Sequence, residues 1–240
     1  MSVEACPDME KDTWYTDAIK YWETIDPTIS GMLGGLEFVH LPDIQGSMKF
    51  LTNVNDKLSP LSDSSPENTK PTYACDCGTG IGRVAKHFLL KKFDKVDLVE
   101  QNGKFLQAAQ DTYLKEQHEA QLIGQYFAMG LQDFTPEKNK YDLIWCQWVL
   151  SHLTDEDLVK FLKRCKDGIK EPGGFIGIKE NVVGKTGYTF DSTDSSATRS
   201  IKVFEELFKK AGLEIIYTMQ QQGFPKGLFR VQMWALRPLA

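Results

Sequence analysis

A run of glycines follows a short strand-like segment and leads into a helical pattern. The run contains Gly78, Gly80 and Gly82, with Asp76 before it and Arg83 after it. Glycine lets the backbone turn sharply and approach a ligand closely, and the start of the following helix favours negative charge. The pattern therefore predicts either an anion-binding loop or, without a ligand, a packing turn in an α/β fold.

The spacing separates three ligand classes that use such a loop. A dinucleotide fingerprint counted from Gly78 needs glycine at its sixth position, where Arg83 stands. A P-loop needs Gly-Lys-Ser/Thr, and the one Gly-Lys-Thr, at 184–186, has Lys179 in place of the first glycine. S-adenosylmethionine fits better, because its methionine end carries a carboxylate that Arg83 could pair with. Glu100, after the next strand-like segment, could accept hydrogen bonds from both ribose hydroxyls.

Aromatic and polar side chains gather where later strand-like segments end. Gln147, Trp148 and His152 follow one such segment, and a polar loop with Asp191 and Asp194 follows the next. In open α/β sheets ligands bind beyond the carboxyl ends of strands, so both groups should share one rim. An aromatic plane near carboxylates suits a basic, proline-bearing peptide end. The alternatives are a core tryptophan, an ordinary histidine and a solvated loop.

The elements that must position these residues alternate between strand and helix from residue 73 onward. Such alternation argues for an α/β fold with a mostly parallel sheet covered on both faces. A Gly/Pro-rich turn at 223–227 leaves no room for a helix, so the last two strands should be antiparallel neighbours. The predicted strands are 73–77, 95–100, 125–129, 141–145, 174–179, 213–219 and 228–236; the predicted helices are 81–91, 103–117, 155–168 and 199–211. Asn102 and Thr154 are the expected N-caps and Gly212 a terminator.

The chain divides into three stretches that differ in composition and hydrophobic pattern. Residues 1–58 form an N-terminal helical extension, in which Trp14, Ala18, Tyr21, Trp22 and Ile25 recur near helical spacing before a glycine-rich bend at 31–35. Residues 59–71 read as an exposed loop because they hold three prolines and four serines. Residues 72–240 form the α/β domain.

Composition limits the class of protein. A chain of 240 residues with 41% hydrophobic and 25% charged residues fits one globular unit. The net charge of −5 speaks against a nucleic-acid clamp. Its five cysteines show no metal or disulfide spacing, which favours a reducing compartment and no metal. Without a signal-like N-terminus or an apolar run of about 18 residues, we expect no membrane partner.

The glycine loop resembles motif I of the class I, Rossmann-like, S-adenosylmethionine-dependent methyltransferases. That resemblance implies a seven-stranded, mostly parallel sheet whose last two strands form an antiparallel hairpin. Several blocks in the same order also resemble the eukaryotic protein N-terminal (α-N) methyltransferases over about residues 14–237. These blocks are 21–22, 31–35, 77–83, 130–136, 144–148, 152–155, 178–181 and 194–196.

The resemblance implies a function and a set of site residues. The family transfers methyl from S-adenosyl-L-methionine to the free α-amine of proteins that begin X-Pro-Lys/Arg after loss of the initiator Met, leaving S-adenosyl-L-homocysteine. Implied cofactor contacts are Gly78, Arg83, Glu100, Leu131, Gln132, Gln147, Trp22 and Leu33, the last two from an extension that covers the site. Implied substrate contacts are Trp148, Asn181, Asp191 and Ser196, while His152 and Asp194 assist deprotonation of the amine.

The chain departs from the family pattern in places. Glu100 stands where the family usually has aspartate, Phe229 replaces a tyrosine that faces the substrate, and the loop 182–190 is divergent. Two other functions stay open: methylation of a small molecule at nitrogen or oxygen, and cofactor binding without catalysis by an interaction protein. We expect a monomer in the cytoplasm, the nucleus or both, with no nucleic-acid partner.

Overall fold

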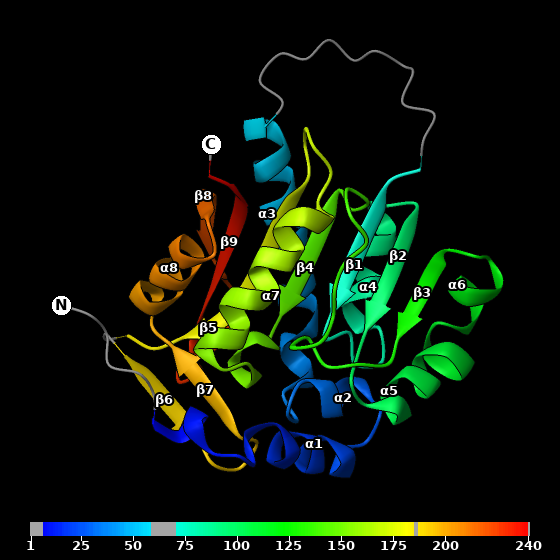
Figure 1. The fold of residues 1–240 in the computed structure, drawn as a ribbon. Coiled ribbons are helices and arrows are strands. Elements are labelled where there is room, and N and C mark those ends of the chain that lie inside the picture. The colour runs from blue at the N-terminus through cyan, green and yellow to red at the C-terminus, as the bar shows by residue number, and fades with distance from the viewer. Residues whose placement is uncertain (1–6, 59–70, 185–186, 240) are drawn as a thin grey trace.

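The computed structural model describes residues 7–58, 71–184 and 187–239 (Figure 1). Within these residues, seven strands form one sheet in the order β3-β2-β1-β4-β5-β9-β8, and β6 and β7 form a separate hairpin. The strands are β1 (Tyr73–Cys77), β2 (Lys95–Val99), β3 (Ile123–Phe127), β4 (Leu143–Gln147), β5 (Phe175–Val182), β6 (Tyr188–Asp191), β7 (Ser196–Arg199), β8 (Leu213–Gln220) and β9 (Arg230–Pro238).

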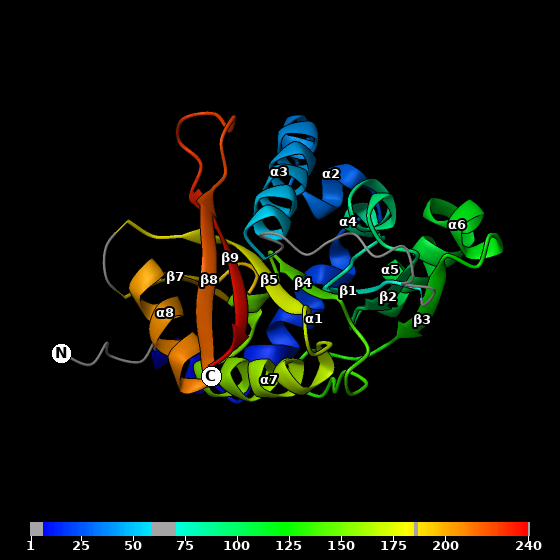
Figure 2. The same cartoon turned by 90° about the horizontal axis from the view of Figure 1, so that it is seen from above.

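Helices lie on both faces of the sheet and along one of its edges. They are α1 (Trp14–Thr24), α2 (Ile29–Met32), α3 (His40–Leu58), α4 (Arg83–His87), α5 (Gly103–Ala108), α6 (Lys115–Glu119), α7 (Asp155–Gly168) and α8 (Ile201–Lys210). Figure 2 shows α3 and α4 on one face and α7 on the other. Short 3-10 turns occupy Pro7–Glu10, Glu37–Val39, Leu89–Lys91 and Leu150–His152, and a π-helical turn occupies Ala109–Tyr113.

The strand directions bring several carboxyl ends to one edge. Parallel pairing links β1 to β2 and β4, β2 to β3, and β4 to β5, whereas β9 runs antiparallel between β5 and β8. The predicted mostly parallel sheet with an antiparallel last pair is therefore confirmed. In Figure 1 the arrowheads of β1, β2 and β3 point toward the edge along which α1 lies.

The core is split by the sheet into two layers, as the alternation along β4 shows. Leu143 and Trp145 belong to the apolar layer under α3 and α4, and Ile144 and Cys146 belong to the layer under α7 and α8. All five residues of this central strand are buried, which is typical of a parallel strand covered on both faces. Four free cysteines lie buried among the described residues. No helix in the described part of the chain has the length and apolarity to cross a membrane.

Several elements begin or end where the local sequence patterns predict. Strand β1 and helix α7 have the predicted bounds. The side chains of Asn102 and Thr154 accept hydrogen bonds from the first turns of α5 and α7, which confirms both N-caps. Gly212 has φ +74° just after α8, as expected of a helix terminator.

Other elements differ from the predictions. The predicted helix 81–91 is α4 followed by a 3-10 turn, because Gly82 at φ +84° delays its start. The predicted helix 103–117 is interrupted by the π-helical turn between α5 and α6. Helix α2 occupies part of the predicted bend 31–35, and α3 and the β6–β7 hairpin were not predicted. Residues 59–70 of the predicted loop lie outside the described residues.

A buried carboxylate fastens α3 to the sheet. Asp43, fully buried, lies 2.7 Å from Arg83 Nη1 and 2.5 Å from Lys179 Nζ, and it accepts Gln147 Nε2 at 2.8 Å. Lys179 Nζ also donates to the Asp43 carbonyl at 2.8 Å and to Ser47 Oγ at 3.0 Å. Burial alone would raise the pKa of Asp43, yet the two cations together hold that pKa below its usual value.

We predict that Asp43→Asn lowers the free energy of unfolding by about 3–5 kcal/mol, because it leaves two cations without their buried counter-charge. The measurement is urea denaturation followed by circular dichroism. Asp56→Asn, an exposed site on the same helix, is the matched control and should change stability by less than about 0.5 kcal/mol. Equal denaturation midpoints for the two variants would contradict a structural role for Asp43.

Candidate active site

Three open cavities line the carboxyl edge of the sheet. Two of them, of about 430 and 650 Å³, share Gly78 and Glu100 among their lining residues, and we call them the glycine-loop cavities. The third, of about 1060 Å³, is lined by Trp148, Asn181 and Asp194 among others, and we call it the hairpin cavity. His152 lines all three cavities, so it stands where they meet.

The glycine loop is held in a conformation that only glycine adopts readily. Gly78 has φ +74°, and a Cβ at this position would lie 2.5 Å from Val149 Cγ2. The Asp76 carboxylate accepts Thr79 Oγ1 at 2.7 Å and the Ala85 N–H at 3.2 Å, which ties both sides of the loop to β1. Burial raises the pKa of Asp76 to about 6.

Glu100 faces the glycine-loop cavities from the end of β2. Its Oε2 accepts the Gly80 N–H at 2.9 Å, and its Oε1 accepts the Asn102 N–H at 2.9 Å. Burial raises the pKa of Glu100, while these amide donors oppose the rise. A carboxylate in this place can accept hydrogen bonds from the two hydroxyl groups of a ribose, which is the role predicted for Glu100 from the sequence.

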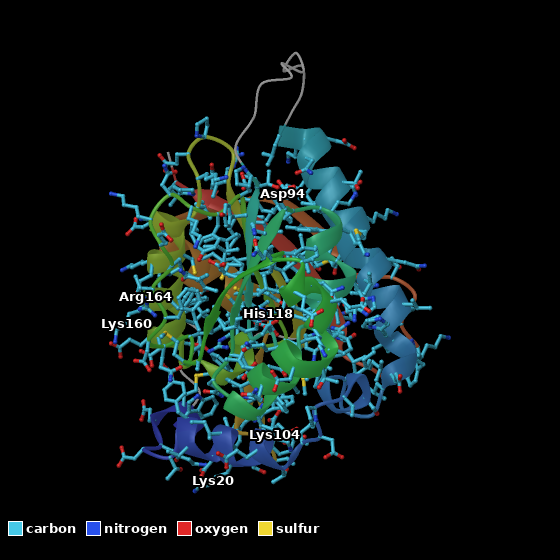
Figure 3. All side chains as sticks on the ribbon, turned by 90° about the vertical axis from the view of Figure 1, so that its right-hand side faces the viewer. Lys20, Asp94, Lys104, His118, Lys160 and Arg164 are labelled. Atoms are coloured by element: carbon cyan, nitrogen blue, oxygen red, sulfur yellow. The ribbon has the colours of Figure 1, made fainter. Side chains whose placement is uncertain are left out.

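The predicted contacts Leu131 and Gln132 line one glycine-loop cavity and are positioned from behind by α7. Arg164, labelled in Figure 3, donates from Nη2 to the carbonyls of Leu131 and Gln132 at 2.9 Å each. Its Nε donates to the Phe134 carbonyl at 2.7 Å. One guanidinium therefore fixes the segment after β3 through three backbone oxygens.

Arg83 and Gln147 line a glycine-loop cavity but are also bound to Asp43. Arg83 Nη1 contacts Asp43 Oδ2 at 2.7 Å and His40 Nδ1 at 3.2 Å. Gln147 accepts Trp145 Nε1 at 3.0 Å and donates to Asp43. The structure thus places a cation, a carboxylate and a narrow glycine loop around one space. This arrangement of charged side chains and glycine backbone fits the amino-acid end and the ribose of S-adenosylmethionine.

The turn after β4 presents an aromatic ring in an unusual backbone conformation. Trp148 has φ +52°, a region that bulky residues rarely adopt. Its backbone N–H donates to the Lys179 carbonyl at 3.0 Å. The N–H groups of Val149 and Leu150 both donate to Glu180 Oε1 at 2.8 Å. Burial raises the pKa of Glu180 to about 7.

Side chains from two other elements hold the far end of this turn. Arg199, from β7, donates to the carbonyl of Leu150 at 2.8 Å and to that of Leu153 at 2.6 Å. Trp14 Nε1, from α1, donates to the His152 carbonyl at 2.7 Å. The turn that carries Trp148 and His152 is therefore held at both ends by distant residues.

The ring of His152 and the carboxylate of Asp194 both line the hairpin cavity and interact electrostatically. Trp22 Nε1 lies 3.1 Å from His152 Nε2, and the Ser195 carbonyl lies 3.4 Å from His152 Nδ1. Burial lowers the pKa of His152, and the Asp194 charge opposes this shift. Asp194 Oδ1 is buried and has no hydrogen-bond partner within the part of the chain that the structure describes.

The remaining predicted site residues lie around the hairpin cavity, with one exception. Asn181, Ser196 and Leu33 line it, so Leu33, predicted as a cofactor contact, lines the hairpin cavity and neither glycine-loop cavity. Phe229 also lines it and is 48% exposed. Asp191 is exposed at the end of β6 and does not line the cavities. Every other predicted site residue lines at least one of them.

Sequence reasoning missed Asp43, Glu180, Arg199 and Trp14 as residues that shape this site. Glu180 carried a usable signal, because it is an acidic residue next to Asn181, just after the apolar start of a predicted strand. Asp43 carried none, since its partners lie 40 to 136 residues away in the sequence. Among the described residues, no group of three or more His, Cys, Asp or Glu side chains is arranged to hold a metal ion.

Comparison with known proteins agrees with this geometry. Residues 10–237 match the family described as AdoMet dependent proline di-methyltransferase. The N-terminal Xaa-Pro-Lys N-methyltransferase 1 of Danio rerio is 43% identical over 98% of this chain and 100% of its own length. Alpha N-terminal protein methyltransferase 1 of Schizosaccharomyces pombe is 45% identical over 96% of this chain and 99% of its own length.

A solved structure agrees with the fold. A SAM-dependent methyltransferase of Leishmania major superposes with a TM-score of 0.80 at 35% identity, covering 93% of this chain and 83% of the other. The predicted Rossmann-like methyltransferase fold is therefore confirmed. This chain belongs to the family of AdoMet-dependent proline di-methyltransferases.

Proposed function

We propose that this protein transfers methyl groups from S-adenosylmethionine to the free α-amine of proteins that begin X-Pro-Lys or X-Pro-Arg. One observation carries the proposal: the ring of His152 lies where the hairpin cavity meets the glycine-loop cavities, and Asp194 Oδ1, which has no partner among the described residues, belongs to the lining of the hairpin cavity. The names of the relatives, which specify Xaa-Pro-Lys N-termini, support it. The reaction would leave S-adenosylhomocysteine as product.

The glycine-loop cavities would hold the cofactor through groups already described. Arg83 would pair with its carboxylate, Glu100 with its ribose hydroxyls, and the Gly78 backbone would allow close approach. When bound, S-adenosylmethionine supplies an activated methyl group to a nucleophile placed in line with it. Because Trp148 and His152 line both kinds of cavity, a ligand in the hairpin cavity can reach that methyl group.

The acceptor must be a neutral amine, because an ammonium has no lone pair. A protein α-amine has a pKa of about 7.7–8.0, so roughly one molecule in seven is neutral at pH 7. A lysine side chain, with a pKa of about 10.4, would be neutral only about once in 2,500. Asp194 Oδ1 can hold the ammonium, and neutral His152 can take up its proton.

The hairpin cavity also suits the residues that follow the amine. The ring of Trp148 lines it and offers a flat apolar face to a proline ring, with Phe224 6.4 Å away between centroids. Asn181 can bond the peptide backbone. We propose that Asp191, exposed beyond the cavity, meets the basic third residue together with Ser196.

We predict that activity depends on the free α-amine of the peptide and on proline at its second position. A peptide that begins Ser-Pro-Lys should be methylated. Acetyl-Ser-Pro-Lys should not be methylated because it lacks a free amine, and Ser-Ala-Lys should not because it lacks the proline ring. Transfer of label from S-adenosylmethionine, with mass spectrometry of each peptide, measures this. Methylation of the acetylated peptide, or of small amines in preference to all three peptides, would refute the proposal.

We predict that Asp194→Asn lowers kcat by about 100-fold, because the ammonium is no longer held where His152 can take its proton and positioned proton transfer contributes about that factor. The Kd for S-adenosylhomocysteine should change less than about twofold, since Asp194 lines only the hairpin cavity. Asp191→Asn is the matched control and should mainly raise the KM for the peptide. Steady-state kinetics and calorimetry provide the measurements, and an unchanged kcat in Asp194→Asn would remove this carboxylate from the mechanism.

We predict that kcat for Ser-Pro-Lys peptides stays level from neutral pH to below pH 6.5 and then falls. Burial places the pKa of His152 below 6.5, so its ring remains neutral and able to accept a proton across this range. If the bound amine had to lose its proton to solvent first, the fall would instead begin near the amine pKa of about 7.7–8.0. Profiles of kcat against pH at saturating substrate distinguish the two cases.

A further inference from the structure

Trp22 connects the N-terminal helices to the ring of His152. From α1, its Nε1 donates to His152 Nε2 at 3.1 Å, and the two rings meet edge to face with centroids 5.9 Å apart. The same indole packs edge to face on Phe105 of α5 at 6.3 Å. The ring of Trp22 therefore lines one glycine-loop cavity and the hairpin cavity, and its N–H group donates to His152 Nε2.

The two partners of the imidazole specify where its proton lies. An indole N–H can only donate, so His152 Nε2 must carry its lone pair toward Trp22. A backbone carbonyl can only accept, so the Ser195 oxygen, 3.4 Å from Nδ1, calls for a hydrogen on Nδ1. Ser195 is itself held at φ +52° in the turn that also carries Asp194. Both contacts select the same neutral form.

We propose that Trp22 is a positioning residue that fixes His152 as its Nδ1–H tautomer, with the Nε2 lone pair directed to the junction of the glycine-loop and hairpin cavities. The assignment of the tautomer rests on the two hydrogen bonds alone. Its catalytic use rests on the proposed function: as the ammonium docks at Asp194, one of its N–H groups replaces the indole N–H at Nε2 and passes its proton there. The amine keeps the electron pair and becomes the nucleophile.

Several ionisable groups line the same cavities as His152. They are Asp194 from the β6–β7 turn, Glu180 from β5, Arg199 from β7, Glu100 after β2, Arg83 from α4 and Tyr15 from α1. The indole donor stabilises the neutral ring against protonation, since a hydrogen bond to the neutral form disfavours the charged one. Loss of that donor should therefore raise the pKa of His152, adding to the upward pull of Asp194.

The test is side-chain ¹⁵N NMR of the protein labelled at histidine. The chain has only four histidines, and His152→Gln identifies the resonances of His152 by their disappearance. At pH 8 we expect His152 as the Nδ1–H form in the wild-type protein. In Trp22→Phe, which keeps an aromatic ring over the site, we expect a shift toward the Nε2–H form that free histidine prefers.

Trp14→Phe is the matched control, because it makes the same substitution on the same helix. Trp14 donates to the backbone carbonyl of His152 and not to its ring, so the tautomer should be retained. A wild-type His152 in the Nε2–H form, or an unchanged tautomer in Trp22→Phe, would overturn the proposal. These spectra need no turnover, so they fail or succeed independently of the proposed substrate.

Titration and kinetics extend the test. Trp22→Phe should raise the pKa of His152 by about 0.5–1 unit, the worth of one hydrogen bond. The fall in kcat at low pH should move upward by the same amount, while the Kd for S-adenosylhomocysteine changes less than about twofold. Trp22→Ala, which also loses the contact with Phe105, should weaken that binding further. A purely covering role predicts no change in either pH profile for Trp22→Phe.

Discussion

The site depends on how the turn after β4 is held. Parallel pairing carries β4 to the edge of the sheet, but pairing alone would leave the next five residues free to move. Glu180 and Arg199 remove that freedom from opposite ends, one by accepting two backbone N–H groups and the other by donating to two carbonyls. Trp148 can therefore stay in a backbone conformation that a bulky side chain would not keep in an unrestrained loop.

Asp43 performs the corresponding task on the other side of the glycine loop. Its carboxylate compensates two buried cations and bonds Gln147, so Arg83 is already placed and desolvated. A cation in this state loses little water when a carboxylate ligand arrives, which favours binding of an amino-acid end. Because Asp43 belongs to α3, the N-terminal helices take part in holding residues that line a glycine-loop cavity.

Local signals predicted the parts of the fold that local physics determines. The glycine loop, the capped helix α7 and the antiparallel last strands each carry a pattern within about fifteen residues. Helix α3 escaped prediction because its buried face includes Asp43 and Ser47, which hide its amphipathic period. The β6–β7 hairpin lies in a stretch that looks merely polar, and its fixed shape depends on Arg199 reaching the turn after β4. Resemblance to a family supplied candidate roles for site residues, but no pattern in the sequence shows which distant side chains hold them.

The charge of the hairpin cavity poses a conflict that its geometry can resolve. In the proposed reaction, Asp194 would attract a cationic N-terminus, but the same carboxylate would stabilise its unreactive ammonium form. At about 1.4 kcal/mol per pKa unit, neutralising an α-amine at pH 7 costs roughly 3.5 kcal/mol less than neutralising a lysine side chain. Tight binding of the cation is therefore compatible with turnover for an α-amine if a neutral acceptor stands beside it. His152, kept neutral by burial and bonded at both ring nitrogens, has the properties of such an acceptor. A lysine side chain in the same place would be held by the same charge but would rarely present its lone pair, so the lower pKa of an α-amine would favour chain termini over lysine side chains.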